Sequence, residues 1–196
     1  MILLGTFAGL RWGELVGMKR KCLNLEACTV RVESTVVELN GSTLLLDQPP
    51  KSEAGRRVVS FPAYLRSVLE AHLKKYTGED ADSYVFTSPK GTVLRRSNFR
   101  PVWVKALDAA GLTGVRVHDL RHTGATIAAQ TGATLKELMN RIGHSTARAA
   151  INYQHAADGR DQEIASALDK LIKKETQKGR ARQRAHKRKP SGRDQD

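Results

Sequence analysis

The stretch HDLRHTGATIAAQTG, residues 118–132, joins a cluster of polar side chains to an apolar pattern. His118 and Arg121 lie three positions apart, so on a helix their side chains project from the same face. The apolar residues of the stretch recur at helical spacing and predict a helix whose inner face carries Leu120, Ala125 and Ile127–Ala128. We therefore expect a buried helix that presents an imidazole and a guanidinium group together.

Helical patterns also surround this stretch. The opening residues MILLGTFAGL are apolar but lack a preceding basic flank, which favours a buried helix over a secretory signal. Glycines are expected to end two helices, one over 97–110 at Gly111 and one over 134–142 at Gly143. Further helices are expected near 9–19, from Pro62 onward with Leu65, Val68, Leu69, His72 and Leu73 on one face, and over 161–174.

A β-rich region separates the first helices from the later ones. The run TVRVESTVVEL, residues 29–39, is rich in β-branched residues and predicts a strand that ends at the Asn40–Gly41 turn. Residues 43–47 and 56–61 predict two more strands, joined by the loop QPPKSEAG as a hairpin tip. The predicted fold class is thus α+β, mainly helical, with a small three-stranded antiparallel sheet.

Charge gives the first indication of function. The 196 residues carry 33 Lys+Arg against 20 Asp+Glu, a formal net charge of +13. Residues 173–196 hold a surplus of 7 positive charges, and the rest of the chain is also basic. Such a protein most often binds a polyanion, either nucleic acid or an acidic membrane surface. Aromatic residues make up only 5% of the chain, which argues against base stacking on single strands as the main activity.

We expect one compact domain over residues 1–172, because neither a repeat nor a Gly/Ser/Pro-rich linker interrupts it. Residues 173–196 have almost no apolar side chains and are expected to form a disordered basic tail. This tail either solubilises the chain or contacts a nucleic-acid backbone, and both interpretations stay open. Two cysteines are too few for a disulfide framework, and no apolar run is long enough to cross a bilayer, which favours the cytoplasm.

Five separated patches carry candidate functional residues. They are Arg11 in AGLRWGEL, Lys51 in QPPKSEAGRRV, His118 and Arg121 in HDLRHT, His144 in IGHST, and Tyr153 in INYQHA. Taken singly, each has an ordinary structural interpretation, such as a surface arginine or a core tyrosine. Taken in this order and spacing, they resemble the catalytic domain of the tyrosine recombinases, the family of phage integrases and site-specific recombinases. The resemblance covers the chain from Leu3 to about Leu171.

The residue types suit the cleavage of a DNA phosphodiester without a metal. That reaction needs a nucleophile, compensation of the charge on phosphorus, and a proton for the departing oxygen. Tyr153 can supply the nucleophile and form a covalent phosphotyrosine. Arg11 and Arg121 are planar cations suited to bidentate contact with phosphate oxygens, and His144 adds another donor.

The resemblance implies further roles. Lys51 would be the general acid that protonates the leaving 5′ oxygen, although Lys19, Arg20, Arg56 and Arg57 are also near in the sequence. His118 would assist proton handling at Tyr153, and Glu14 would orient Arg11. The pair His118 and His122 has a spacing that suits zinc, but no third ligand is evident, so we expect neither a metal nor another cofactor.

The resemblance also implies partners and domain organisation. The partner would be double-stranded DNA, bound by a homotetramer on paired sites, whereas the chain alone would be monomeric. A core-binding domain and most of the leading catalytic helix, usual in the family, are expected to be missing, so DNA binding should be weak and sensitive to salt. The helix over 161–174 would pack either on its own core or on a neighbouring protomer.

Three alternatives to an integrase remain. One is a DNA-binding remnant that has lost its catalytic activity. Another is a type IB topoisomerase, which shares the active-site plan but relaxes supercoils without site choice. The third is a metal-dependent nuclease. The residues of the GLRWGEL and HDLRHT motifs resemble those of integrases and favour that function.

Overall fold

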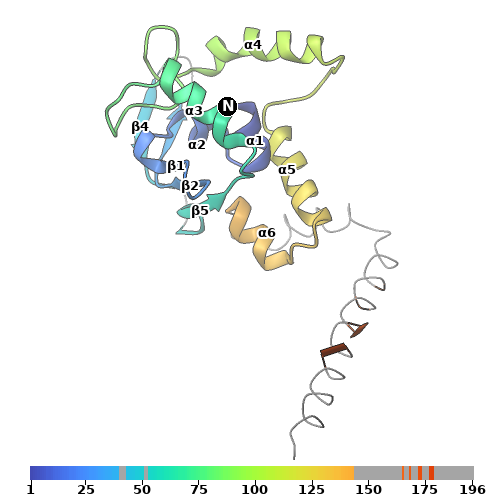
Figure 1. Ribbon diagram of the computed structural model, residues 1–196. Helices are drawn as coiled ribbons and strands as arrows, with labels where there is room; N and C mark the ends of the chain where they lie inside the picture. Colours follow the sequence, from blue (N-terminus) through green and yellow to red (C-terminus); the bar gives the residue numbers. More distant parts are fainter. Residues whose placement is uncertain are drawn as a thin grey trace, which may run out of the picture. The chain divides into compact units, whose positions relative to one another are not determined.

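The computed structural model describes residues 1–39, 43–50 and 53–143, together with six single positions between 165 and 178. Contacts divide the chain into two units, Met1–Ala157 and Asp158–Asp196, and the fold described below belongs to the first (Figure 1). In the second unit, the described positions Ala165, Leu168, Ile172 and Lys173 are helical and exposed. The remaining residues of the helix predicted over 161–174 lie outside the described part of the chain.

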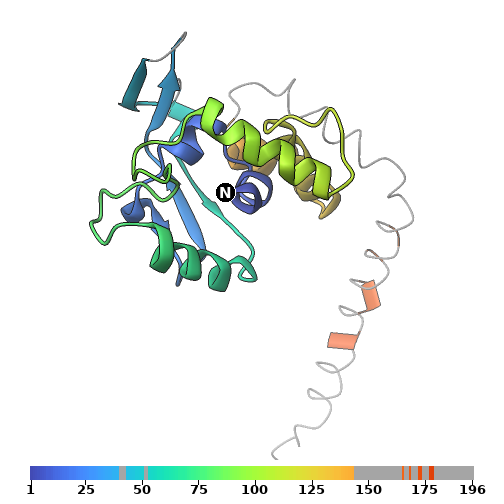
Figure 2. The same ribbon diagram turned by 90° about the horizontal axis from the view of Figure 1, so that it is seen from above.

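The first unit is mainly helical, as the apolar patterns predict. Its helices are α1 (Ile2–Phe7), α2 (Trp12–Val16), α3 (Leu65–Tyr76), α4 (Arg96–Ala109), α5 (Asp119–Gln130) and α6 (Leu135–Ile142), with short 3-10 turns η1 (Arg20–Cys22) and η2 (Glu53–Gly55). Its strands are β1 (Leu23–Asn24), β2 (Thr29–Val32), β3 (Thr35–Glu38), β4 (Leu44–Gln48) and β5 (Arg57–Ser60). Seen from above, α1 lies between the strands and the pair α4 and α5 (Figure 2).

The strands form two antiparallel sheets rather than one. The order of the first is β1–β2–β5, and β3 pairs with β4 in the second. A three-stranded sheet is therefore present, but its membership differs from the prediction, because the run 29–39 breaks at the polar pair Glu33–Ser34 into two strands. Val30 lies opposite Val59, and both are buried, which anchors the register of the first sheet. The connection that carries Lys51 thus joins two sheets and is not the tip of a hairpin.

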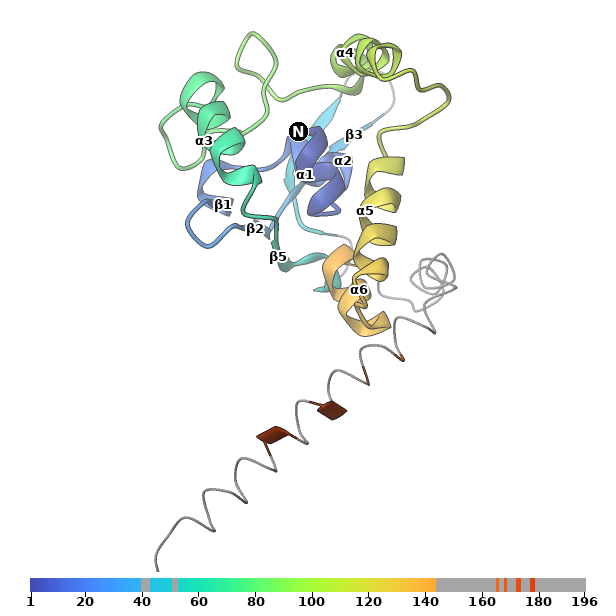
Figure 3. The same ribbon diagram turned by 45° about the vertical axis from the view of Figure 1, so that its right-hand side comes forward.

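The core has two larger apolar clusters among the described residues. In the first, α1, α2 and α3 pack on the β1–β2–β5 sheet, with Leu4, Leu15 and Leu65 at most 2% exposed. In the second, Trp12 of α2 contacts Phe99 of α4 with ring centroids 5.3 Å apart. Ala125, Ala129, Leu138 and Ile142 form a smaller cluster that joins α5 to α6. Figures 1 and 3 both show α6 beside the lower end of α5, close to β5.

Helix α5 approaches the backbone of α1 closely at Gly124. A Cβ atom built on Gly124 would lie 1.8 Å from the carbonyl oxygen of Thr6, so only glycine fits there. Glycine inside a helix costs about 1 kcal/mol relative to alanine, and the close approach of the two helices accounts for it. Arg121, Ala125 and Ala129 of α5 are buried, whereas Ile127 is 40% exposed, so the predicted inward placement of Ile127 is wrong.

The predicted ends of the helices agree with the structure better than the predicted buried faces do. Gly111 and Gly143 follow α4 and α6 with φ angles of 66° and 58°, which confirms both predicted stops. The helix expected near 9–19 is shorter, because Gly9 has a left-handed backbone and Arg11 an extended one, so α2 covers only Trp12–Val16. On α3 the predicted face holds for Leu65, Leu69 and Leu73, whereas Val68 is 46% exposed.

Among the described residues, no helix combines the length and the apolar character needed to cross a bilayer.

Candidate active site

Arg11 stands at the start of α2 and is held by Glu14. Its backbone is extended, and its N–H donates to Oε2 of Glu14 at 2.8 Å, while its Nη1 donates to Oε1 at 2.9 Å. A carboxylate in the first turn also suits the positive end of the helix dipole. Because the Arg11 side chain is 40% exposed, one side of its guanidinium faces solvent while the other is fixed.

Glu14 is a buried carboxylate shared between two arginines. Its side chain is only 4% exposed, and Arg57 donates Nη1 to Oε1 at 3.0 Å and Nη2 to Oε2 at 2.9 Å. Burial by itself raises the pKa of Glu14, but the hydrogen bonds and charge of Arg57, followed by those of Arg11, outweigh it and bring the pKa below its ordinary value. Glu14 is therefore ionised at neutral pH and able to orient Arg11.

Arg121 is the largest fully buried side chain among the described residues, with 1% exposure. From α5 it donates Nη1 to the carbonyl oxygen of Gly9 and Nη2 to that of Ile142. Gly9 has a φ angle of 61° and lies two residues before Arg11. A single guanidinium thus ties the segment that carries Arg11 to the end of α6.

The C-terminus of α6 is the point where three guanidinium groups meet. The carbonyl oxygen of Arg141 accepts from Arg57 Nε at 2.9 Å, that of Ile142 accepts from Arg121, and that of Gly143 accepts from Arg11 Nη2 at 2.9 Å. The last carbonyls of a helix lack partners within it and carry partial negative charge, so cations stabilise them. This arrangement brings Arg11 and Arg121 to successive carbonyls directly before His144.

His118 lies at the first turn of α5 with an exposed side chain. Its ring meets that of His122 edge to face, with centroids 4.7 Å apart. Partial burial of the ring, followed by the charges of His122 and Arg121, brings the pKa of His118 below its ordinary 6.5. The imidazole is therefore neutral at pH 7 and able to accept a proton. In the described part of the chain, no group of three or more His, Cys, Asp or Glu side chains is placed to hold a metal ion.

The lowered pKa of His118 gives a prediction about pH. We expect its imidazole resonance to titrate with a midpoint below 6.5 in an NMR experiment, with assignment by the loss of that signal in His118→Gln. Since the unfolded chain takes up this proton at higher pH than the folded chain, His118 should lower stability as the pH falls below 6.5. A midpoint at or above 6.5 would contradict this prediction.

Lys51, His144 and Tyr153 lie outside the described residues, so their roles stay predictions. The other cations near Lys51 in the sequence can be placed. Lys19 pairs with Asp47 at 3.0 Å, and Arg57 is buried against Glu14. From the sequence, Arg57 was considered only as a neighbour of Lys51, and its contacts were not predicted. The one signal available was the pair Arg56–Arg57 at the start of a strand, where neighbouring side chains point to opposite faces.

Comparison with known proteins identifies the family. A protein-family model described as "Phage integrase family" matches residues 1–160 of the chain. The chain is 44% identical over 173 residues to the putative prophage phiRv2 integrase of Mycobacterium tuberculosis, covering 87% of this chain and 45% of that protein. It is 34% identical over 170 residues to the integrase of Mycobacterium phage L5, covering 86% and 46%. The chain belongs to the phage integrase family, and it spans about half the length of these curated relatives.

Solved structures show the same fold. The Tn1549 transposon integrase, in complex with transposon right end DNA, superposes with a TM-score of 0.70 at 20% identity, over 87% of this chain and 57% of that one. The catalytic domain of bacteriophage HP1 integrase gives a TM-score of 0.53 at 17% identity, over 87% and 81%. The mainly helical α+β fold of the tyrosine recombinase catalytic domain is thereby confirmed for this chain.

Proposed function

We propose that this chain is the catalytic portion of a site-specific DNA recombinase, an integrase that cleaves and rejoins DNA strands through a 3′-phosphotyrosine at Tyr153. The observation that carries the proposal is the meeting of Arg11 and Arg121 on the carbonyls of Gly143 and Ile142, next to His144 in the sequence. Family membership supports the same activity.

Each residue has a role in the proposed step. The Tyr153 oxygen attacks phosphorus, and its proton passes to His118, whose lowered pKa keeps the ring neutral and able to accept it. The bond from phosphorus to the 5′ oxygen breaks, and Lys51 protonates that oxygen. Arg11, Arg121 and His144 donate to the non-bridging oxygens and offset their charge. Rejoining is the reverse sequence.

Double-stranded DNA is the proposed partner. Related chains have been solved with DNA, among them the Tn1549 transposon integrase and XerH recombinase with its difH substrate. The basic surplus of the whole sequence favours the same partner, since phosphate contacts supply most of the affinity for a duplex. We further propose that active complexes are homotetramers on paired sites and that an isolated chain is monomeric.

Covalent capture tests the proposed reaction. The substrate is a library of nicked DNA duplexes whose central sequence is randomised. A strand-transferring enzyme becomes covalently attached to the duplexes that contain its own site, and these can be recovered and sequenced. The wild-type chain should form an adduct that survives denaturing electrophoresis, and Tyr153→Phe should abolish it because the attacking oxygen is gone. Tyr64→Phe is the matched control, since Tyr64 is 82% exposed and lies outside the proposed site.

Other outcomes would replace the proposal. DNA binding without any adduct would indicate a DNA-binding remnant. An adduct together with relaxation of plasmids at no preferred site would indicate a topoisomerase. Cleavage that a chelator abolishes and Tyr153→Phe does not would indicate a metal-dependent nuclease.

A further inference from the structure

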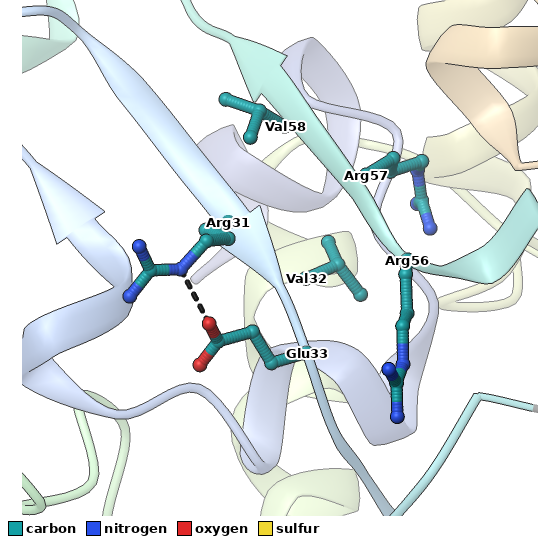
Figure 4. A pocket seen from close by; sticks show the side chains of 6 residues that line it. All are labelled: Arg31, Val32, Glu33, Arg56, Arg57 and Val58. Atoms are coloured by element: carbon teal, nitrogen blue, oxygen red, sulfur yellow. Dashed lines mark ion pairs between the residues drawn. The ribbon is translucent and has the colours of Figure 1, made fainter. Parts of the chain in front are cut away.

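Arg57 is a buried guanidinium on a strand whose neighbouring arginine is exposed. Arg57 begins β5 with a side chain only 6% exposed, whereas Arg56 faces solvent. Figure 4 shows Arg57 leaving β5 on the side away from Arg31, whose guanidinium pairs with Glu33 at the surface. Arg57 therefore belongs to the interior of the site rather than to the basic surface.

The donors of Arg57 reach three segments of the chain. Two bonds, at 3.0 and 2.9 Å, go to the Glu14 carboxylate, which also holds Arg11. Nε donates to the carbonyl of Arg141 at 2.9 Å, and Nη1 also donates to the carbonyl of Gly55 at 3.1 Å. Gly55 closes the connection that carries Lys51, and Arg141 precedes His144 by three residues. One side chain thus contacts the carboxylate that holds Arg11, the end of η2 and the last turn of α6.

Stability alone does not account for this arrangement. A buried ion pair gains little net stability over apolar residues of similar size, because both charges lose their hydration. Its geometric effect is larger, since a bidentate fork fixes the plane of the Glu14 carboxylate and so the direction of Arg11. Small displacements of a catalytic group cost much more in rate than in binding.

We infer that Arg57 is a positioning residue for strand cleavage. Through Glu14 it aims Arg11 at the scissile phosphate, and through the carbonyls of Gly55 and Arg141 it holds the end of η2 against α6. The inference rests on the proposed function and deepens it. Arg57 itself does not touch DNA.

Single-turnover capture with saturating DNA tests this role. Arg57→Met should lower the rate constant of adduct formation about 10–100-fold, with a DNA dissociation constant within about twofold of wild type. The final amount of adduct should stay near wild type, since a merely structural defect would lower that amount and leave the rate constant of the folded fraction unchanged. Arg31→Met is the matched control, because that guanidinium is 52% exposed and should leave both unchanged.

Two further variants keep the test valid if Arg57→Met folds poorly. Arg57→Lys keeps the charge opposite Glu14 but loses the planar fork, so it should fold and still react slowly. The double variant Glu14→Gln with Arg57→Met removes both buried charges. Because part of the action of Arg57 passes through Glu14, Arg57→Met should slow the Glu14→Gln variant by a smaller factor than it slows the wild type.

The outcomes separate the inference from the proposed function. If the wild-type chain forms no Tyr153 adduct, the proposed function fails and the inference fails with it. If the wild type reacts and folded Arg57 variants react at the same rate, only the inference is overturned. Slowing of the double variant by the product of the two single effects would also overturn it, since the two residues would then act independently.

Discussion

Replacing Arg121 by lysine is expected to slow adduct formation by about 10²–10³-fold, the usual effect of removing one preorganised donor from a transition state. Arg121 is buried, and its fork reaches the carbonyls of both Gly9 and Ile142. Lysine keeps the charge but carries it as a point on a flexible stem, so it cannot hold two carbonyls and a phosphate in one plane.

The measurement is the single-turnover rate constant on the selected nicked duplex. Arg116→Lys is the matched control, because Arg116 lies just before the same helix, is 79% exposed and pairs with Asp119 at 3.1 Å. Its rate should stay within about twofold of wild type. An Arg121→Lys rate equal to that of the control would show that this guanidinium has no part in the chemistry.

The second large effect is on stability and concerns Glu14. We expect Glu14→Gln to lower the free energy of unfolding by about 3–5 kcal/mol, because the substitution leaves the charge of Arg57 buried without its counterion. Both side chains of this pair are at most 6% exposed, so solvent screens the interaction little. Glu33→Gln is the control, since the ion pair that Glu33 forms with Arg31 is exposed and should contribute at most about 1 kcal/mol.

Urea unfolding at several pH values measures this effect. The lowered pKa of Glu14 means that its ionised form stabilises the folded state above pH 4.5 and that this contribution is lost as the pH falls through the folded-state pKa. The difference between wild type and Glu14→Gln should therefore shrink as the pH is lowered below 4.5. A difference that stays constant with pH would exclude the charge as its cause.

Local signals predict where elements of this fold begin and end. Glycine after an apolar helical run correctly ended α4 at Gly111 and α6 at Gly143, because only glycine adopts the left-handed backbone at no cost. Periodicity also identified Leu65, Leu69 and Leu73 as core residues of α3. These features depend on residues within one or two helical turns of each other.

Features that depend on distant contacts were not predictable in this way. The sheet that pairs β2 with β5 requires the chain to break at Glu33–Ser34, and a run of β-branched residues hides that break. Gly124 of α5 packs on the carbonyl of Thr6, more than a hundred residues earlier, and Ile127 of the same helix is 40% exposed. Neither the pairing of β2 with β5 nor the contact of Gly124 with Thr6 can be predicted from the residues of one segment alone.

In the candidate site, too, residues within local motifs were predicted and residues that act through distant contacts were not. Motif resemblance named Arg11, His118 and Arg121, and it also gave Glu14 its orienting role. It did not find Arg57, whose contacts with Glu14 and with the carbonyl of Arg141 span 43 and 84 positions. The roles of Lys51, His144 and Tyr153 stay predictions, which the capture experiment addresses for the tyrosine.

The end of α6 has a consequence for regulation of activity. An isolated helix of eight residues is marginal in water, so α6 depends on the contacts that hold it in place. Because three guanidinium groups from separate elements bind its last carbonyls, a sub-global opening of α6 would release Arg11 and Arg121 at once. Hydrogen exchange of the α6 amides would then report the population of an inactive form long before the whole domain melts.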